Sequence, residues 1–280
     1  MEIKRIKWNQ IAVGNYTYPL FPFSYFLESM ERLNVENIEL WAAGPHLYLE
    51  DLAFIDLVKM EKEIYSHGLK AVCFTPEQCM YPINIGAEEK WIRDRSVRYF
   101  EKGLEATETL GIKKMIVTPG NGYRNKNSKE TRKYTVDNLR YLADRAKEKD
   151  ITLLLEHLTK ETTNLAITAK ELKELNWEVA RSNLVCMVDT DMMSRYGESI
   201  YDYMDVFNGE IHHVHLVDGM PGGHLAIGDG CLPIDQFWKE LEIAEYKEYI
   251  SLEITNDRYH LNPDDAVRKS LEWISQKVEK

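Results

Sequence analysis

The chain has 280 residues, a mass of 32.7 kDa, 44% hydrophobic residues and a formal net charge of −11. This composition is globular and sufficient for a large core, so it excludes a disordered chain. The acidic balance argues against nucleic acid as a partner, because a phosphate-backbone binder needs basic surface. No apolar run approaches the ~20 residues of a membrane span, and MEIKRIKWNQ at the start lacks a signal peptide's apolar stretch. The four scattered cysteines form no CxxC pair, and we expect a cytoplasmic protein without a membrane partner.

Eight short apolar runs, several of them rich in Val and Ile, recur along the chain. Such runs are typical of strands buried on both faces of a parallel sheet. The predicted strands are QIAVG (10–14), NIELW (37–41), KAVCFT (70–75), KMIVT (114–118), TLLLE (152–156), LVCMVD (184–189), HHVHLVD (212–218) and YISLEI (249–254).

Amphipathic stretches lie between these runs and predict helices. Two of them end at Gly68 and Gly111, and glycine commonly ends a helix. The predicted helices cover residues 24–33, 49–68, 88–111, 128–149, 168–176, 199–207, 233–241 and 262–280.

The alternation of strand and helix predicts a parallel α/β fold in one domain covering residues 1–280. Eight units are the number of a (β/α)8 TIM barrel. A doubly wound open sheet is the alternative, because periodicity alone does not separate the two. The first strand leads into VGNYTYPLFPF, which lacks the glycine-rich turn of a dinucleotide-binding fold.

The functional groups of a TIM barrel lie at the C-terminal ends of its strands. The fifth to eighth predicted strands carry Glu156, Asp189, His215 and Glu253 at those ends. Buried charges are costly unless they are paired or metal-bound, and this oxygen-rich set suits Mn²⁺, Mg²⁺ or Co²⁺ better than a structural zinc. Acidic residues and His are common in the chain, so the pattern alone leaves a structural role open.

Two His on the seventh strand strengthen the functional interpretation. His213 and His215 share one face of that strand, since side chains alternate along a strand. A single core His is usually structural, whereas two on one barrel-facing side favour a site.

Several motifs along nearly the whole chain carry a family resemblance. They are IELWAAGPH (38–46), FTPEQCMYPIN (74–84), LLLEHLT (153–159) with Asn164, MVDT (187–190), HHVHLVD (212–218), HLAIGDG (224–230) and ISLEIT (250–255). Together they resemble the xylose-isomerase-like TIM-barrel superfamily of sugar isomerases and epimerases. Within it, the chain is most similar to the fructoselysine 3-epimerase branch, which is related to the ketose 3-epimerases.

The resemblance implies a metal centre and an acid–base pair. The family's metal ligands correspond to Glu156, Asp189, His215 and Glu253, and its two catalytic carboxylates correspond to Glu156 and Glu253. A bound divalent metal would stabilise an enediolate as a Lewis acid, while the two carboxylates move a proton between opposite faces of the carbon. We expect Mn²⁺ first, with Co²⁺, Ni²⁺, Mg²⁺, Fe²⁺ or Zn²⁺ as alternatives.

Further positions match the family's substrate contacts. We expect His224, His46, Glu77 and Trp41 to contact the substrate or line its pocket. Epimerases carry a loop Glu six residues after the fifth-strand Glu, but here that position is Thr162, so Glu161 is the candidate replacement.

A second departure concerns the residue three positions after the metal Asp. Ketose 3-epimerases usually have His there, whereas this chain has Met192, which favours the fructoselysine-type branch.

The function expected from the resemblance is inversion of carbon 3 of a ketose or ketosamine of the fructoselysine/psicoselysine type. An aldose–ketose isomerase acting on a sugar or sugar phosphate is the main alternative. A cyclitol-type dehydratase or lyase, a non-catalytic sugar-binding barrel and an apurinic-site endonuclease are further alternatives. The endonuclease ranks last, because it needs many more His and a basic face. The expected partners are a small sugar or sugar-amine substrate and further copies of this chain, in a dimer or tetramer.

Two other clusters each have a structural interpretation and a functional one. Tyr16, Tyr18, Phe21 and Phe23 follow the first strand and form either a packed loop or an apolar wall over the substrate. A basic cluster near the fourth strand is either solvated surface or a contact for phosphate or carboxylate. Its members are Arg124, Lys126, Lys129, Arg132 and Lys133.

Overall fold

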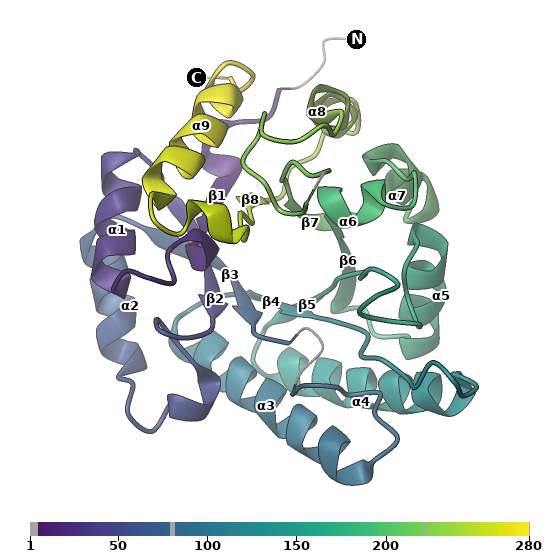
Figure 1. Cartoon of the computed structure of the whole chain (residues 1–280). Helices are drawn as coiled ribbons and strands as arrows, with labels where there is room; N and C mark the ends of the chain where they lie inside the picture. The colour runs from purple at the N-terminus through teal and green to yellow at the C-terminus, as the bar shows by residue number, and fades with distance from the viewer. Residues whose placement is uncertain (1–4, 79–81, 221, 280) are drawn as a thin grey trace.

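The computed structural model describes residues 5–78, 82–220 and 222–279. Eight parallel strands close into a barrel in chain order, β1 to β8, with helices around the outside (Figure 1). The strands are β1 (Ile11–Gly14), β2 (Asn37–Ala42), β3 (Lys70–Pro76), β4 (Lys114–Val117), β5 (Thr152–Leu155), β6 (Leu184–Asp189), β7 (Ile211–His215) and β8 (Ile250–Leu252). The predicted barrel is confirmed, and the doubly wound sheet is excluded because β1 pairs with β8.

The helices lie close to their predicted positions. They are α1 (Phe23–Arg32), α2 (Leu57–Ser66), α3 (Lys90–Thr109), α4 (Lys129–Glu148), α5 (Ala169–Val179), α6 (Thr190–Ser194), α7 (Ile200–Val206), α8 (Ile234–Ile243) and α9 (Pro263–Ser275). Short 3₁₀ turns cover Trp8–Gln10, Asn15–Thr17, Leu49–Asp51 and Asp257–Tyr259. Gly68 and Gly111 have positive φ angles of 71° and 69° beyond α2 and α3, as expected of helix-ending glycines.

One predicted helix is shorter than expected. The single helix predicted over 49–68 is replaced by a 3₁₀ turn and α2, because Asp56 caps α2. Its carboxylate accepts a hydrogen bond from the Lys59 N–H at 2.9 Å. The short helix α6, directly after β6, was not predicted.

The core has two layers. Most buried apolar side chains pack between the strands and the surrounding helices. A second cluster of four buried residues, one each from β3 to β6, is formed by Cys73, Ile116, Leu154 and Met187. Leu154 and Met187 each lie two residues before an acidic strand-end residue, and strand alternation therefore places Glu156 and Asp189 on the same face. Cys73 and Cys186 are buried, while Cys79 lies outside the described residues.

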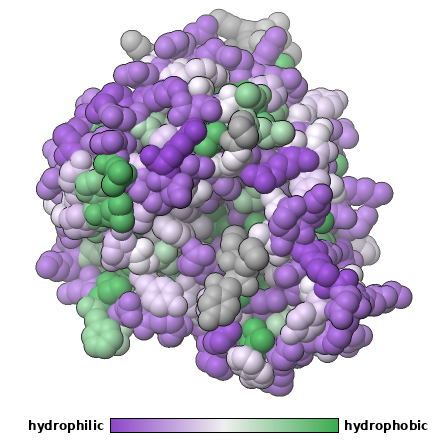
Figure 2. Space-filling view, viewed as in Figure 1, coloured by the Kyte–Doolittle hydropathy of each residue, from purple (hydrophilic) through white to green (hydrophobic). Residues whose placement is uncertain are grey.

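The two ends of the described chain meet. Lys7 and Glu279 form a parallel β-bridge beside the start of the barrel. The face seen in Figure 2 is largely hydrophilic, with apolar side chains in small separate groups. Within the described residues, none of the helices combines the length and apolarity needed to cross a membrane.

Candidate metal centre

Four acidic and imidazole side chains converge at the C-terminal ends of β5 to β8. Glu156 and Glu253 directly follow β5 and β8, while Asp189 and His215 are the last residues of β6 and β7. Each offers one ligand atom, and these four atoms all lie within 4.8 Å of one another. Parallel strands in a closed barrel bring their ends to one rim, which is why residues nearly 100 positions apart meet.

The atoms at the centre of this cluster lack ordinary hydrogen bonds. His215 Nδ1 lies 2.9 Å from Glu253 Oε2 and 3.5 Å from Glu156 Oε1. Among the described residues, these three atoms and Asp189 Oδ2 are buried without a hydrogen-bond partner. Buried polar atoms are normally satisfied, so a converging set of this kind fits a cation that would complete it. Three carboxylates and one imidazole are a donor set suited to a divalent metal.

The burial and close spacing of these groups shift the pKa values of the carboxyl groups in different directions. Burial raises the pKa of Glu156 to about 7, with the charge of Glu253 adding to the effect. Burial also acts to raise the pKa values of Glu253 and Asp189, but neighbouring His side chains outweigh it. The pKa of Glu253 is therefore lowered, and that of Asp189 falls to about 2. A divalent cation would lower the pKa values of all three carboxyl groups, since it favours the ionised carboxylates.

His224 reaches the cluster from the loop after β7. Its Nε2 lies 3.3 Å from Asp189 Oδ2 and 3.2 Å from Glu253 Oε2. The residue has a left-handed backbone, with φ of 52°, and its side chain is 19% exposed. This position, beside the candidate ligands and open to solvent on one side, is suited to a substrate hydroxyl.

A second buried cluster lies against His215 and was not predicted from the sequence. Glu39, in β2, is completely buried and contacts both His213 and His215. Burial acts to raise the pKa of Glu39, but the two imidazoles outweigh it and hold the pKa well below its usual value. The signal available in the sequence was a carboxylate inside the apolar run NIELW, where an unpaired charge would be costly.

His46 lies apart from the candidate ligands, in a closed hydrogen-bonded position. Its Nδ1 accepts from the Asn15 side-chain amide at 2.8 Å, and its Nε2–H donates to the Phe21 carbonyl at 2.8 Å. The ring also packs beside Phe23 and Phe26. Since both ring nitrogens have protein partners, this geometry favours a structural role over the predicted substrate contact.

Trp41 and Glu77 form a polar and aromatic wall with Tyr16. The Trp41 indole N–H donates to Glu77 Oε2 at 3.0 Å, and its ring stacks on Tyr16 with centroids 5.2 Å apart. Tyr16 in turn meets the His215 ring edge-on at 6.4 Å. Trp41 and Glu77 are therefore linked to the candidate centre through Tyr16, and the sequence had not separated Tyr16 from the other loop aromatics.

The loop after β5 carries Glu161 and Thr162, at and beside the position where epimerases have a loop Glu. Glu161 is exposed, and the Thr162 hydroxyl bonds to Thr159 within the same loop. Neither side chain joins the converging atoms of the candidate centre among the described residues.

A second difference from ketose 3-epimerases lies three residues after Asp189, where those enzymes usually have His. Met192 is buried in α6, where it contributes a backbone N–H to Asp189 Oδ1 at 2.7 Å. Asp191 beside it is buried and pairs with Arg195 at 2.7 Å. Asp191 and Arg195 pack against the loop that carries His224, because a Cβ on Gly223 would lie 2.6 Å from Arg195 and 2.8 Å from Asp191.

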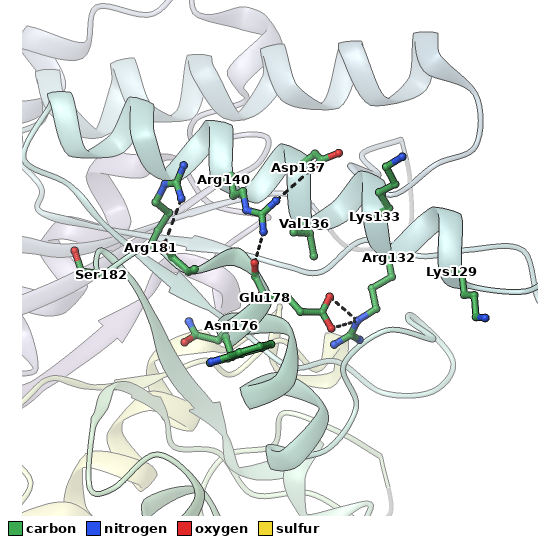
Figure 3. A pocket seen from close by; sticks show the side chains of 12 residues that line it. Lys129, Arg132, Lys133, Val136, Asp137, Arg140, Asn176, Glu178, Arg181 and Ser182 are labelled. Atoms are coloured by element: carbon green, nitrogen blue, oxygen red, sulfur yellow. Dashed lines mark hydrogen bonds and ion pairs between the residues drawn. The ribbon is translucent and has the colours of Figure 1, made fainter.

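The basic cluster near β4 lies on the outside of the barrel. Part of it lines a hollow of about 990 Å³ between α4 and α5, shown in Figure 3. Arg132 pairs there with Glu178 at 3.0 Å, and Arg140 donates to the Glu178 carbonyl. Elsewhere in the cluster, Lys126 pairs with Glu88. These surface ion pairs agree with the interpretation of this cluster as solvated surface.

The chain belongs to the xylose isomerase-like TIM barrel family, whose model matches residues 27–277. It is similar to fructoselysine 3-epimerase of Escherichia coli O157:H7, with 22% identity over 254 residues, covering 90% of this chain and 92% of that protein. D-allulose 3-epimerase from Methylomonas sp. shares the fold with a TM-score of 0.78, 19% identity and coverage of 98% and 99% of the two chains. 3-Keto-D-glucoside 4-epimerase from E. coli does so with a TM-score of 0.79, 18% identity and coverage of 95% and 99%. These relatives are sugar epimerases.

Proposed function

We propose that this protein is a divalent-metal-dependent sugar epimerase that inverts carbon 3 of a ketose or ketosamine. The observation that carries the proposal is the convergence of Glu156, Asp189, His215 and Glu253 at the C-terminal rim of the barrel. The similarity to fructoselysine 3-epimerase supports a substrate of the fructoselysine/psicoselysine type.

The chemistry follows from the positions of the two glutamates. A proton on carbon beside a carbonyl is too weakly acidic for water to remove at neutral pH. A divalent metal would supply Lewis-acid stabilisation of the negative charge that develops on the adjacent oxygens. Glu156 and Glu253 extend from β5 and β8, so a sugar bound between them would present opposite faces of carbon 3 to the two carboxyl groups. One glutamate, ionised, removes the proton, and the other glutamate, protonated, returns a proton to the opposite face.

The remaining polar groups would bind and orient the substrate. We assign His224 to a substrate hydroxyl, because its Nε2 lies beside Asp189 and Glu253 while its side chain is partly exposed. Trp41 and Glu77 would line one side of the pocket through their hydrogen bond.

The donor set also indicates which metal ion the site would bind. Three carboxylates and one imidazole favour a hard or borderline ion, and we propose Mn²⁺ as the native one. Metal analysis of protein purified without added metals checks this choice. The dimer or tetramer expected from the resemblance belongs to the same proposal and is checked by light scattering.

The function is tested by incubating the Mn²⁺-loaded protein with fructoselysine in D₂O, removing the metal with a chelator and recording the sugar protons by NMR. We expect loss of the carbon-3 proton signal and the appearance of a second diastereomer. Exchange at carbon 1, with no exchange at carbon 3, would instead identify an aldose–ketose isomerase. A metal-loaded protein that exchanges no proton of fructoselysine, D-fructose or D-allulose would contradict the epimerase.

A further inference from the structure

A completely buried carboxylate lies directly behind the candidate metal centre. Glu39, in the middle of β2, has no solvent-exposed surface. Its Oε1 accepts hydrogen bonds from the Tyr16 hydroxyl and the Thr75 hydroxyl, each at 2.7 Å. An isolated buried carboxylate would be strongly destabilising, so its retention within the barrel needs an explanation.

Two imidazoles complete the surroundings of Glu39. His213 Nε2 lies 2.8 Å from Oε2, and His215 Nε2 lies 2.9 Å from Oε1 and 3.1 Å from Oε2. A carboxylate can only accept hydrogen bonds, so Nε2 of His215 must carry a proton and donate it. In a neutral imidazole the other nitrogen, Nδ1, is then the one with a free lone pair.

Nδ1 of His215 is the atom that faces the candidate ligands. It lies 2.9 Å from Glu253 and 3.5 Å from Glu156, on the side of the ring away from Glu39. Nε2 of His215 therefore faces the Glu39 carboxylate behind the ring, whereas Nδ1 faces the candidate ligands in front of it.

We propose that Glu39 is a positioning residue that holds Nε2–H of His215 and thereby directs the Nδ1 lone pair toward a divalent metal ion. This inference rests on the metal centre of the proposed function. A carboxylate behind a ligating His sets its tautomer, restrains the ring and makes the ligand nitrogen more basic.

Glycine at position 14 supports this arrangement. The Tyr16 ring folds back over Gly14, where a Cβ would lie 2.2 Å from its Cδ2 atom. The same ring stacks on Trp41, which holds the hydroxyl against Glu39. Glu39 is thus fixed by neighbours from β3, β7 and the turn after β1.

The test compares the metal affinities of the full-length wild type, Glu39→Gln and Glu272→Gln. Mn²⁺ binding to metal-free protein is measured by competition with a chelator, and folding is checked by circular dichroism. Glu39→Gln should bind Mn²⁺ about 10–100-fold more weakly, because the neutral amide oxygen is a weaker acceptor for the His215 N–H than the carboxylate. Glu272→Gln is the matched control: it makes the same chemical change at an exposed position on α9, so its affinity should stay near that of the wild type.

A second measurement does not depend on the variant folding. In Zn²⁺-loaded wild-type protein labelled with ¹⁵N-histidine, NMR should show a protonated Nε2 and a metal-bound Nδ1 on His215. Metal on Nε2, or unchanged Mn²⁺ affinity in folded Glu39→Gln, would overturn the role of Glu39 while leaving the metal centre intact. A wild-type protein that binds neither ion would overturn the metal centre and this inference together.

Discussion

At the scale of single residues, the candidate centre depends on how buried charges are paired. Glu156, Asp189 and Glu253 are acidic side chains in or near a hydrophobic barrel, and His215 and His224 lie between them. Burial lowers the pKa values of both imidazoles, but the surrounding carboxylates outweigh it and raise them well above the usual value. Each carboxyl group therefore has a distinct environment, which is the arrangement that acid–base chemistry requires.

Glu253→Gln should abolish turnover while leaving the fold intact. The amide is nearly isosteric but cannot exchange a proton at this position, and loss of general acid–base catalysis typically costs about 10²–10⁴-fold in rate. The measurement is deuterium exchange at carbon 3, with circular dichroism to check the fold. Glu272→Gln, an exposed position on α9, is the matched control and should retain wild-type turnover. Near-native turnover in Glu253→Gln would rule out its catalytic role.

His46 should remain neutral down to a lower pH than an ordinary His. Burial lowers its pKa below the usual 6.5, and protonation would place an N–H against the Asn15 amide, which already donates to Nδ1. The unfolded chain therefore takes up the proton first as pH falls. The stabilisation from His46 is fully present above about pH 6.5 and declines below it.

An NMR titration of the His46 ring in the folded protein checks this expectation. Its midpoint should lie below 6.5, and the His46→Gln variant should lack the corresponding part of the acid-induced loss of stability. A midpoint at or above 6.5 would contradict the structural role of this ring.

At the scale of elements, the loop after β7 is organised by a single carboxylate. Asp218, which is 2% exposed, accepts from the backbone N–H groups of Gly219, Gly228, Gly230 and Leu232 at 2.8–3.1 Å. Its own backbone forms a bridge with Leu225, next to His224. The loop is therefore held in a defined shape, and His224 reaches the candidate centre without a regular helix or strand to carry it.

Asp218→Ala should destabilise the protein by about 2–3 kcal/mol, since buried backbone donors would lose a charged acceptor. Because the loop carries His224, kcat/KM should fall as well. Urea unfolding and sugar exchange kinetics measure the two effects. Asp205→Ala, exposed on α7, is the control and should lie within about 0.5 kcal/mol of wild type. Equal stability of the two variants would show that Asp218 does not organise the loop.

At the scale of the whole molecule, the candidate metal centre joins strands from one half of the barrel. Its four candidate ligands come from β5, β6, β7 and β8, and Glu39 connects His215 to β2 on the other side. An ion bound only by the folded barrel must stabilise it, because the unfolded chain does not hold these groups together.

Saturating Mn²⁺ should therefore raise the free energy of unfolding by about 2.7 kcal/mol when the free metal is 100 times its Kd. Urea unfolding with Mn²⁺ and with a chelator measures the difference. Asp189→Asn keeps the side-chain oxygen that caps α6 but loses the ligand charge, so it should show much less stabilisation. Equal effects of Mn²⁺ on wild type and variant would place the ion elsewhere.

Local sequence determined the elements of this protein. Continuous apolar runs marked all eight strands, and glycines marked the ends of α2 and α3, because hydrophobic periodicity and backbone freedom act over a few neighbouring residues. Acidic residues at the ends of apolar runs also indicated the candidate ligands. Helix 49–68 was predicted too long, because capping by Asp56 competes locally with helical periodicity.

Only the tertiary structure decided which polar groups meet. The partnership of Glu39 with His215 joins residues 176 positions apart and depends on closure of the barrel. The hydrogen bonds of His46 depend likewise on the path of the loop after β1. A local pattern can identify a costly buried charge, but its partner is set by strand order and register, which bring distant segments together.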